Sequence, residues 1–461
     1  MPSSDHWSYR DALRAIWDRS GYDRGYVSNP FWGDAAAKRG LQRTSALLDH
    51  LGRPQERYGI LHVAGSKGKG STCAFAASIL QAAGYRVGRS TSPHLHTFRE
   101  RIAIDDEPID EPAFAALTRR ALHAAEALER DTPDLGEVTA FELTTAMALD
   151  HMAAARCDIA VVEVGLGGTL DATNVVTPLV AVIAALDLEH TAVLGETLAE
   201  IAANKAGIIK RGRPVAVASL PAEAMAVVES VARERGSTLI AAGREWRVSG
   251  TWRRFTAEGP WGTFEDLESG LAGDYQMENA GLAISAAWLL GTAGYPAPET
   301  AVRSGLAATR WPGRFECFRA GASEVVLDGA HTPASARALR AAIATEYPDR
   351  RAVVVLGAMA DKDVEAIVRV LAPVTRDIVA TAARGPRAAS PEAIAEGAAR
   401  AGLLAVTSPS VAEALHDALS AAGSEGLVVV TGSLATVAEA REALKLARPD
   451  LPVDHEGPSR S

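Results

Sequence analysis

Short apolar runs alternate with helix-length amphipathic stretches along most of this 461-residue chain. Runs of four to eight apolar residues with helical stretches between them predict parallel strands joined by crossover helices, in a sheet covered on both faces. In the first half of the chain, the expected strands lie at residues 59–63, 158–164, 179–186 and 214–218. In the last third, they lie at residues 324–327, 352–356, 377–381 and 426–431.

A different pattern lies between these two series. Tryptophan, threonine and glycine alternate over residues 246–267, which predicts a small antiparallel hairpin region, and a helix is expected at about 275–290. The Trp-Pro-Gly sequence at residues 311–313 then forms a break. At the other end, roughly the first 55 residues look helical, with a leucine stripe that ends before Gly52.

We therefore expect two α/β domains, at residues 1–309 and 310–461, and the chain is long enough for both. Apolar residues make up 48% and charged residues 23%, the balance of a globular protein with large cores. A formal charge of −10 offers no continuous basic face, so we expect no nucleic-acid partner. No apolar run approaches the roughly 20 residues that cross a bilayer, and residues 1–10 contain no apolar leader. We expect no membrane partner and a cytoplasmic location.

The three cysteines, Cys73, Cys157 and Cys317, are far apart and lack any CxxC spacing. This arrangement favours neither a disulfide framework nor a zinc site. We expect buried, reduced thiols.

A turn rich in glycine and lysine, at residues 61–72, follows the first expected strand and opens a helix. Such a turn suits phosphate binding, because glycines let backbone amides face phosphate oxygens and a helix N-terminus favours anions. Lys69 supplies a charge near the transferred group, and Ser71 or Thr72 caps the helix. The match to G-x-x-x-x-G-K-[ST] is imperfect, since Val63 occupies the first glycine position, and a plain loop is the alternative.

Two further polar residues follow expected strands. Glu163 ends the strand at 158–164, and His190 follows the strand at 179–186. Ligands of open α/β sheets collect at the carboxyl ends of strands, and a carboxylate beside a phosphate loop is placed to hold Mg²⁺. The alternatives are a surface glutamate before a glycine-rich turn and a structural histidine.

Other segments occur in one fixed order with this turn: 91–95, 98–102, 163–174, 190–191, 205–210, 311–316, 327–331 and 361–363. From about residue 38 to about residue 440 the series resembles the folylpolyglutamate synthase/dihydrofolate synthase family of Mur ligases. The resemblance implies a Mur-ligase α/β fold. It consists of an N-terminal P-loop ATPase domain with a mostly parallel sheet and a smaller, Rossmann-like C-terminal domain.

The resemblance also implies roles for single residues. The nucleotide-binding positions are Gly65, Gly68, Lys69, Gly70, Ser71, Asn279, Arg314 and Asp328. The positions for two magnesium ions are Ser92, Glu163 and His190. The substrate-binding positions are Thr139, Phe141, Glu142, Leu170, Asp171, Ala172 and Ser433. The catalytic positions are Lys69, Lys205 and His331; Lys205 matches a lysine that is carbamylated in the family, and an ordinary surface lysine is the alternative.

The activity implied is ATP-dependent ligation of L-glutamate to dihydropteroate, to reduced folates, or to both. The acid attacks the γ-phosphate of ATP to give an acyl phosphate, and an amine then displaces phosphate. The partners implied are these small molecules, with ATP and Mg²⁺ as cofactors, and the chain is expected to be a monomer. A K⁺ requirement stays open.

Seven positions depart from the family pattern: Ser66, Lys67, Thr169, Asn204, Thr332, Ala435 and Thr436. They motivate a second hypothesis, a related ligase that couples an amino acid to a different carboxylic acid. A third hypothesis is a nucleotide-binding regulator without catalysis, which would not require the whole set of Lys69, Ser92, Glu163 and His190.

Overall fold

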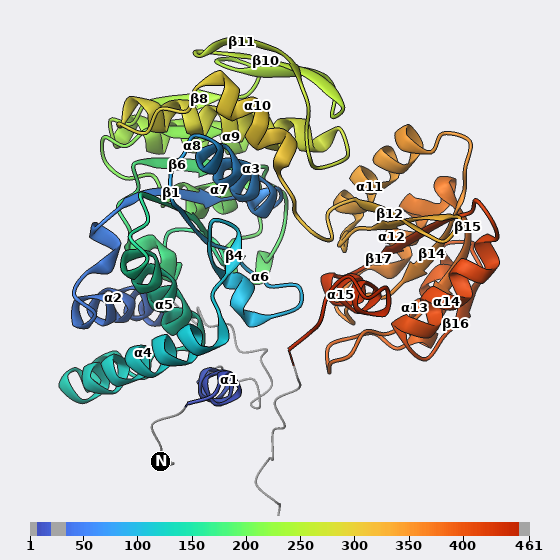
Figure 1. Cartoon of the computed structure of the whole chain (residues 1–461), viewed down its shortest axis with the longest axis horizontal. Coiled ribbons are helices and arrows are strands. Elements are labelled where there is room, and N and C mark those ends of the chain that lie inside the picture. The colour runs from blue at the N-terminus through green and yellow to red at the C-terminus, as the bar shows by residue number, and fades with distance from the viewer. Residues whose placement is uncertain (1–6, 20–33, 451–461) are drawn as a thin grey trace, which may run out of the picture.

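The computed structural model describes residues 7–19 and 34–450 of the chain, which forms an N-terminal α/β part and a C-terminal α/β part (Figure 1). Within these residues the strands form sheets of eight, three and six strands. The expectation that residues 1–10 contain no apolar leader falls partly on residues 1–6, which lie outside the described residues. No helix among the described residues is long and apolar enough to cross a membrane.

The large sheet has the order β4-β3-β2-β5-β1-β6-β7-β8. Its strands are β1 (Gly59–Ala64), β2 (Val87–Ser90), β3 (Ile102–Ile104), β4 (Glu107–Pro108), β5 (Ile159–Glu163), β6 (Val180–Ile183), β7 (Val215–Val217) and β8 (Leu239–Ala241). All neighbours from β2 to β8 in this order pair in parallel, whereas β3 and β4 are antiparallel. Val63 of β1 lies beside Glu163 of β5 and Val182 of β6, so the carboxyl ends of the central strands meet at one edge.

Helices cover both faces of this sheet, as the uninterrupted apolar strands require. They are α1 (Tyr9–Asp18), α2 (Asp34–His50), α3 (Lys69–Ala82), α4 (Glu111–Asp131), α5 (Ala140–Ala154), α6 (Thr191–Leu194), α7 (Leu198–Ala206), α8 (Ala222–Glu234), α9 (Tyr275–Thr292) and α10 (Glu299–Ala308). Leu61 and Val63 pack with α3, α9 and α10 on one face, and Ile60 packs with α1, α2, α4 and α5 on the other. Alternate residues of β1 thus belong to different cores.

A three-stranded antiparallel sheet packs against α9 and closes the first core. Its strands are β9 (Arg247–Thr251), β10 (Arg254–Gly259) and β11 (Gly262–Leu267). Trp246 and Phe255 are buried there at 2% and 1% exposure. The antiparallel region expected at 246–267 is therefore confirmed.

The C-terminal sheet has the order β12-β13-β17-β14-β15-β16; its β12–β13 pair is antiparallel, and its other described pairs are parallel. Its strands are β12 (Glu316–Ala320), β13 (Ser323–Leu327), β14 (Ala352–Leu356), β15 (Thr375–Ala380), β16 (Ala405–Thr407) and β17 (Leu427–Thr431). Its helices are α11 (Pro333–Glu346), α12 (Val364–Leu371), α13 (Pro391–Arg400), α14 (Val411–Ala422) and α15 (Leu434–Ala443). Figure 1 shows α15 on the side of this part that faces the large sheet.

The predicted fold class is confirmed, and every expected strand is present, although several are shorter than expected. The domain boundary near residue 310 stays a prediction; residues 309–315 carry neither helix nor strand. Cys73 and Cys157 are buried, as expected. Cys317 is exposed, so the expectation of a buried thiol is wrong at this position, because β12 is an edge strand.

Candidate active site

The candidate phosphate loop connects β1 to α3 at the carboxyl edge of the large sheet. Gly68 is the N-cap of α3 with a φ of +81°, and a Cβ there would lie 2.3 Å from Oδ1 of Asn279. The amides of Ser66 and Lys67 donate to the carbonyl oxygen of Ala185, at 2.8 and 3.0 Å. The amides left to face an anion are therefore those of the first turn of α3, where helical amides have no acceptor within the helix.

Lys69 lies in that first turn, and its Nζ donates to the carbonyl oxygen of Gly65 at 3.0 Å. Ser71 follows it at 4% exposure. A Cβ on Gly70 would lie 3.0 Å from Nε1 of Trp311, so the glycine lets the linker between the two sheets approach the loop. The ammonium of Lys69 has no carboxylate within ion-pair distance among the described residues.

A partly buried carboxylate, that of Glu189, lies among the lysines of the site. Its Oε2 lies 3.4 Å from Nζ of Lys67, and its Oε1 lies 3.3 Å from Nζ of Lys205. Burial acts to raise the pKa of Glu189, but Lys69 and Lys205 hold it below its usual range. This carboxylate therefore stays ionised and compensates part of the positive charge of the loop.

Lys205 is not a surface lysine, because its side chain is 2% exposed. Its Nζ donates to the carbonyl oxygen of Gly65 at 2.8 Å, and burial, with the nearby charge of Lys69, lowers its pKa to about 8. Carbamylation would place a second anion beside Glu189, which like-charge repulsion disfavours. The expectation of a carbamate at Lys205 finds no support in these contacts, and neither does a K⁺ site.

Glu163 ends β5 and is 6% exposed. Its Oε2 accepts the amide of Ser92 at 3.1 Å, and within the described residues its other oxygen accepts no hydrogen bond. Burial raises the pKa of Glu163, and the charge of Lys69 opposes the rise. A buried carboxylate with one hydrogen bond suits a hard cation.

The third expected metal position, His190, begins α6 and has a φ of +49°. Burial and the charge of Lys205 lower its pKa, so the ring is neutral near pH 7, as a metal ligand must be. No hydrogen bond joins it to Glu163 or Ser92 in the described part of the chain. No cluster of three or more His, Cys, Asp or Glu side chains that could hold a metal ion is found there either.

The nucleotide positions of the C-terminal part gather around Asp328, which follows β13. Its carboxylate accepts the amides of Phe315 at 2.8 Å and Ala330 at 2.9 Å, and the hydroxyl of Tyr275 lies 3.5 Å away. Burial raises the pKa of Asp328, and the guanidinium of Arg314 opposes this rise. Tyr275 comes from α9, the helix that carries Asn279, so residues of both parts meet here.

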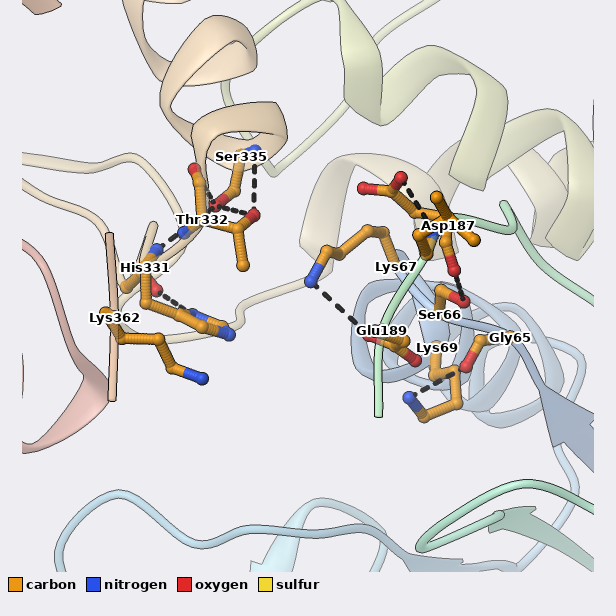
Figure 2. Close-up of polar contacts among 12 residues, drawn as sticks. Gly65, Ser66, Lys67, Lys69, Asp187, Glu189, His331, Thr332, Ser335 and Lys362 are labelled. Atoms are coloured by element: carbon orange, nitrogen blue, oxygen red, sulfur yellow. Dashed lines mark hydrogen bonds and ion pairs between the residues drawn. The ribbon is translucent and has the colours of Figure 1, made fainter. Parts of the chain in front are cut away.

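His331 lies on the C-terminal side, opposite the phosphate loop (Figure 2). Its Nδ1 lies 2.8 Å from the carbonyl oxygen of Gly329 and therefore donates, which leaves Nε2 as an acceptor in the neutral ring. Burial and the ammonium groups of Lys67 and Lys362 lower the pKa of His331. Figure 2 shows Lys67 and Lys362 extending into the space between the two parts, from opposite sides.

Two expected substrate-binding residues hold α5 in place. Thr139 and Glu142 form its capping box, and the carboxylate of Glu142 also accepts two hydrogen bonds from Arg43, at 2.6 and 2.7 Å. Phe141 packs on Gly165, where a Cβ would lie 2.3 Å from the ring. Of these three, Phe141 is the one whose side chain lies against the glycine-rich turn after β5.

Among the remaining substrate candidates, the polar side chains already have hydrogen-bond partners within the protein. Asp171 is 2% exposed and accepts hydrogen bonds from the amide of Leu166 at 2.8 Å and from the amide and hydroxyl of Thr173 at 2.9 and 2.5 Å. Ala172 is buried, whereas Leu170 is partly exposed. Ser433 is the N-cap of α15, and its hydroxyl lies 2.8 Å from that of Thr436.

Three of the positions that depart from the family pattern, Thr169, Asn204 and Thr332, make hydrogen bonds to nearby groups of the protein. The amide and hydroxyl of Thr169 both donate to the carbonyl oxygen of Asn204, at 2.9 and 2.8 Å. Thr332 caps α11, and its hydroxyl lies 2.9 Å from that of Ser335. In contrast, Lys67 places a cation in the open space of the site.

Glu189 and Lys362 were not predicted as site residues, although Lys362 belongs to one of the segments that carry the resemblance. Glu189 precedes His190 at the end of a strand, so the strand-end signal that singled out the histidine applied to it equally. Lys362 pairs with Asp361 at 2.8 Å in a loop, and its approach to His331 depends on how the two parts pack.

Two family models match the chain. The Mur ligase middle domain matches residues 63–287, and the glutamate ligase domain of Mur ligases matches residues 313–434. The chain is similar to the folylpolyglutamate synthase of Lacticaseibacillus casei, with 36% identity over 87% of this chain and 94% of that protein. It is also similar to the dihydrofolate synthase/folylpolyglutamate synthase of Bacillus subtilis, with 34% identity over 88% and 95%.

A similar solved structure is that of Escherichia coli FolC in complex with DHPP and ADP. It superimposes with a TM-score of 0.81 and 32% identity, covering 94% of this chain and 98% of that chain. The sequence similarity and the structural similarity thus both extend over most of this chain.

Proposed function

The chain belongs to the folylpolyglutamate synthase/dihydrofolate synthase family of Mur ligases and is an ATP-dependent ligase, and we propose that it joins L-glutamate to dihydropteroate, to reduced folates, or to both. Relatives that carry the names of the two activities match it over almost their whole length. The hypothesis of a different acid is not favoured by these matches.

One observation carries the proposal: Lys69 and Glu189 face the imidazole of His331 across the space between the two parts (Figure 2). The loop at Lys69, Glu163 and Glu189 lie at the carboxyl ends of β1, β5 and β6, where α/β folds bind ligands. A nucleotide-binding regulator has no need of a neutral histidine opposite the phosphate loop.

Of the three expected metal positions, the two with oxygen donors suit Mg²⁺. Glu163 and the hydroxyl of Ser92 are hard oxygen ligands of the kind that Mg²⁺ accepts together with phosphate oxygens. When bound, Mg²⁺ supplies positive charge that neutralises phosphate oxygens. We assign Glu163 as the principal protein ligand and keep His190 as a second candidate.

In the first step, the carboxylate of the acid attacks the γ-phosphorus of ATP, the bond to the β-bridging oxygen breaks, and ADP leaves. Lys69 lies beside the loop that holds the phosphates, and its ammonium stabilises the charge that develops on the transferred group. Lys67 adds a second cation at the same place, held by Glu189 until an anion arrives.

In the second step, the amine of L-glutamate attacks the carbonyl carbon of the acyl phosphate, and inorganic phosphate leaves from the tetrahedral intermediate. The attacking nitrogen must lose a proton, and Nε2 of His331 is the free acceptor that faces the loop. The low pKa of His331 keeps that nitrogen unprotonated near neutral pH.

The test is phosphate release from MgATP by the purified protein, with L-glutamate and either dihydropteroate or tetrahydrofolate, and mass detection of the product. We expect a product heavier than the acid by one glutamyl unit, and the two acids tested separately show which activity is present. ATP binding without turnover of either acid would rule out the folate assignment.

A further inference from the structure

A cavity of about 380 Å³ opens between the end of β2 and the linker at residues 310–314. Leu95, Trp311 and Leu434 supply apolar walls, and Arg89 supplies a charge. Thr91 and Pro93, on either side of Ser92, also line it, so one end of the cavity adjoins the candidate metal site.

Arg89 is 8% exposed and comes from β2, which pairs directly with β5. Its guanidinium lies over the ring of Trp311, 4.7 Å from the centroid. On one edge it contacts Asp106, at 3.1 and 3.2 Å, and its Nη1 lies 3.5 Å from the hydroxyl of Thr91, the outer limit of a hydrogen bond. A guanidinium has five N–H donors, so part of this buried cation is left for a ligand.

The other acidic group of the cavity does not compete for this charge. The carboxylate of Glu100 accepts the amides of Leu95, His96 and Thr97, at 2.7 to 2.8 Å. Asp106 is half exposed, so solvent screens its pairing with Arg89. A ligand carboxylate that enters the cavity therefore meets an available guanidinium beside an aromatic wall.

The cavity also lies close to the reaction centre. Arg89 pairs with Val161 of β5, two residues before Glu163, and the amide of Ser92, which lies between two lining residues of the cavity, donates to Glu163 at 3.1 Å. A glutamyl unit carries two carboxylates a few bonds apart. In the terminal glutamate of a folate acid one of them reacts with ATP and the other does not, and in L-glutamate the amine reacts and neither carboxylate does.

We propose that the cavity binds the non-reacting carboxylate of a glutamyl unit through the guanidinium of Arg89, and thereby directs the rest of that unit to the reaction centre. The inference rests on the proposed function, because that function supplies the glutamyl unit. Two sources have this chemistry: the terminal glutamate of a folate acid and the incoming L-glutamate.

The experiment compares Arg89→Leu with Arg86→Leu, a control at an exposed arginine just before β2. If the acid is the source, R89L raises KM for tetrahydrofolate at least about tenfold and leaves KM for dihydropteroate unchanged, since one charge-assisted hydrogen bond is lost. If the amino acid is the source, R89L raises KM for L-glutamate with both acids. Equal KM values in wild type and R89L, or the same shift in R86L, overturn the inference.

Two further variants separate binding from folding. Arg89→Lys keeps the charge but loses the planar fork, and we expect it to restore part of the affinity. Asp106→Asn removes the competing carboxylate, and we expect it to lower the same KM that R89L raises; a rise would count against the inference. Melting temperatures of all variants identify any that fail to fold.

A binding measurement keeps this inference distinct from the proposed function. Calorimetric titration of the MgADP-bound protein with γ-glutamyl-glutamate, which has no pterin, is expected to give weaker binding in R89L than in wild type. Wild type that binds this probe but turns over neither folate acid would refute the proposed function and support the cavity assignment. No binding to wild type, together with unchanged KM values in R89L, would refute the cavity assignment.

Discussion

Arg43 and Glu142 form an ion pair inside the N-terminal part, with side chains 12% and 8% exposed and N···O distances of 2.6 and 2.7 Å. Arg43→Met removes the cation and leaves the Glu142 carboxylate buried, with the amide of Thr139 as its remaining partner at 3.0 Å. Breaking a buried pair on one side costs about 3–5 kcal/mol, because the charge that remains is uncompensated. We expect R43M to lower the free energy of unfolding by about that amount.

The assay is equilibrium unfolding in guanidinium chloride, followed by circular dichroism and tryptophan fluorescence, with a fit that allows the two α/β parts to unfold separately. The matched control is Arg254→Met, since Arg254 contacts Asp266 at the same 2.6 Å but the side chains are 77% and 62% exposed. We expect the control to cost at most about 1 kcal/mol. Equal losses in the two variants would refute the argument from burial.

A variant of the same pair tests whether Glu142 contacts the substrate or only stabilises the fold. If the carboxylate acts by capping α5 and pairing with Arg43, Glu142→Gln lowers stability and leaves KM for the acid unchanged in the folded enzyme. A raised KM with unchanged stability would show instead that the carboxylate contacts the substrate.

Three other predictions follow from the site. Lys69→Met is expected to lower kcat at least about a hundredfold in the phosphate-release assay, with little change in melting temperature, because within the described residues its ammonium donates only to the carbonyl oxygen of Gly65. Gly68→Ala is expected to cost about 1–2 kcal/mol in chemical unfolding and to raise KM for ATP, because its φ is +81° and the new Cβ meets Asn279. Burial lowers the pKa of Lys205 to about 8 from an ordinary value of 10.5, so between those pH values the unfolded chain binds more protons than the folded one. The free energy of unfolding is therefore expected to rise with pH over this window, and to rise less steeply in Lys205→Met; a fall would contradict the burial of the ammonium.

The sequence predicted the strands whose residues are mostly apolar. Every residue of β1 and β5 is buried, and such short apolar runs between helices have few other interpretations. In contrast, β2 was missed because its sequence, Val-Gly-Arg-Ser, has a glycine and a cation where a buried strand usually has neither. Arg89 is tolerated there through Asp106 and Trp311, which are distant in the sequence, so no local pattern could predict the strand.

Several residues that the family motifs single out make structural contacts in this protein, and the sequence alone does not show whether they also bind a ligand. The Thr139-x-x-Glu142 spacing is a capping-box signature that was visible in the sequence, and the structure uses it in that way. Asp171 and Ser433 are likewise engaged by neighbouring backbone and hydroxyl groups. A side chain whose polar atoms already have partners must break those contacts before it can bind a ligand, which costs as much as leaving a buried polar group unpaired.

Substrate choice in this chain should therefore depend on polar side chains that keep free donors or acceptors in the space between the two parts. Thr169 does not meet this condition, because its hydroxyl and its amide both donate to the backbone carbonyl oxygen of Asn204. Lys67 and Arg89 do meet it: within the described residues each pairs with a single carboxylate that leaves donors unused, and each lies beside the reaction centre. Variation at these two positions should therefore alter affinity for anionic substrates more than variation at the glycine-rich turn.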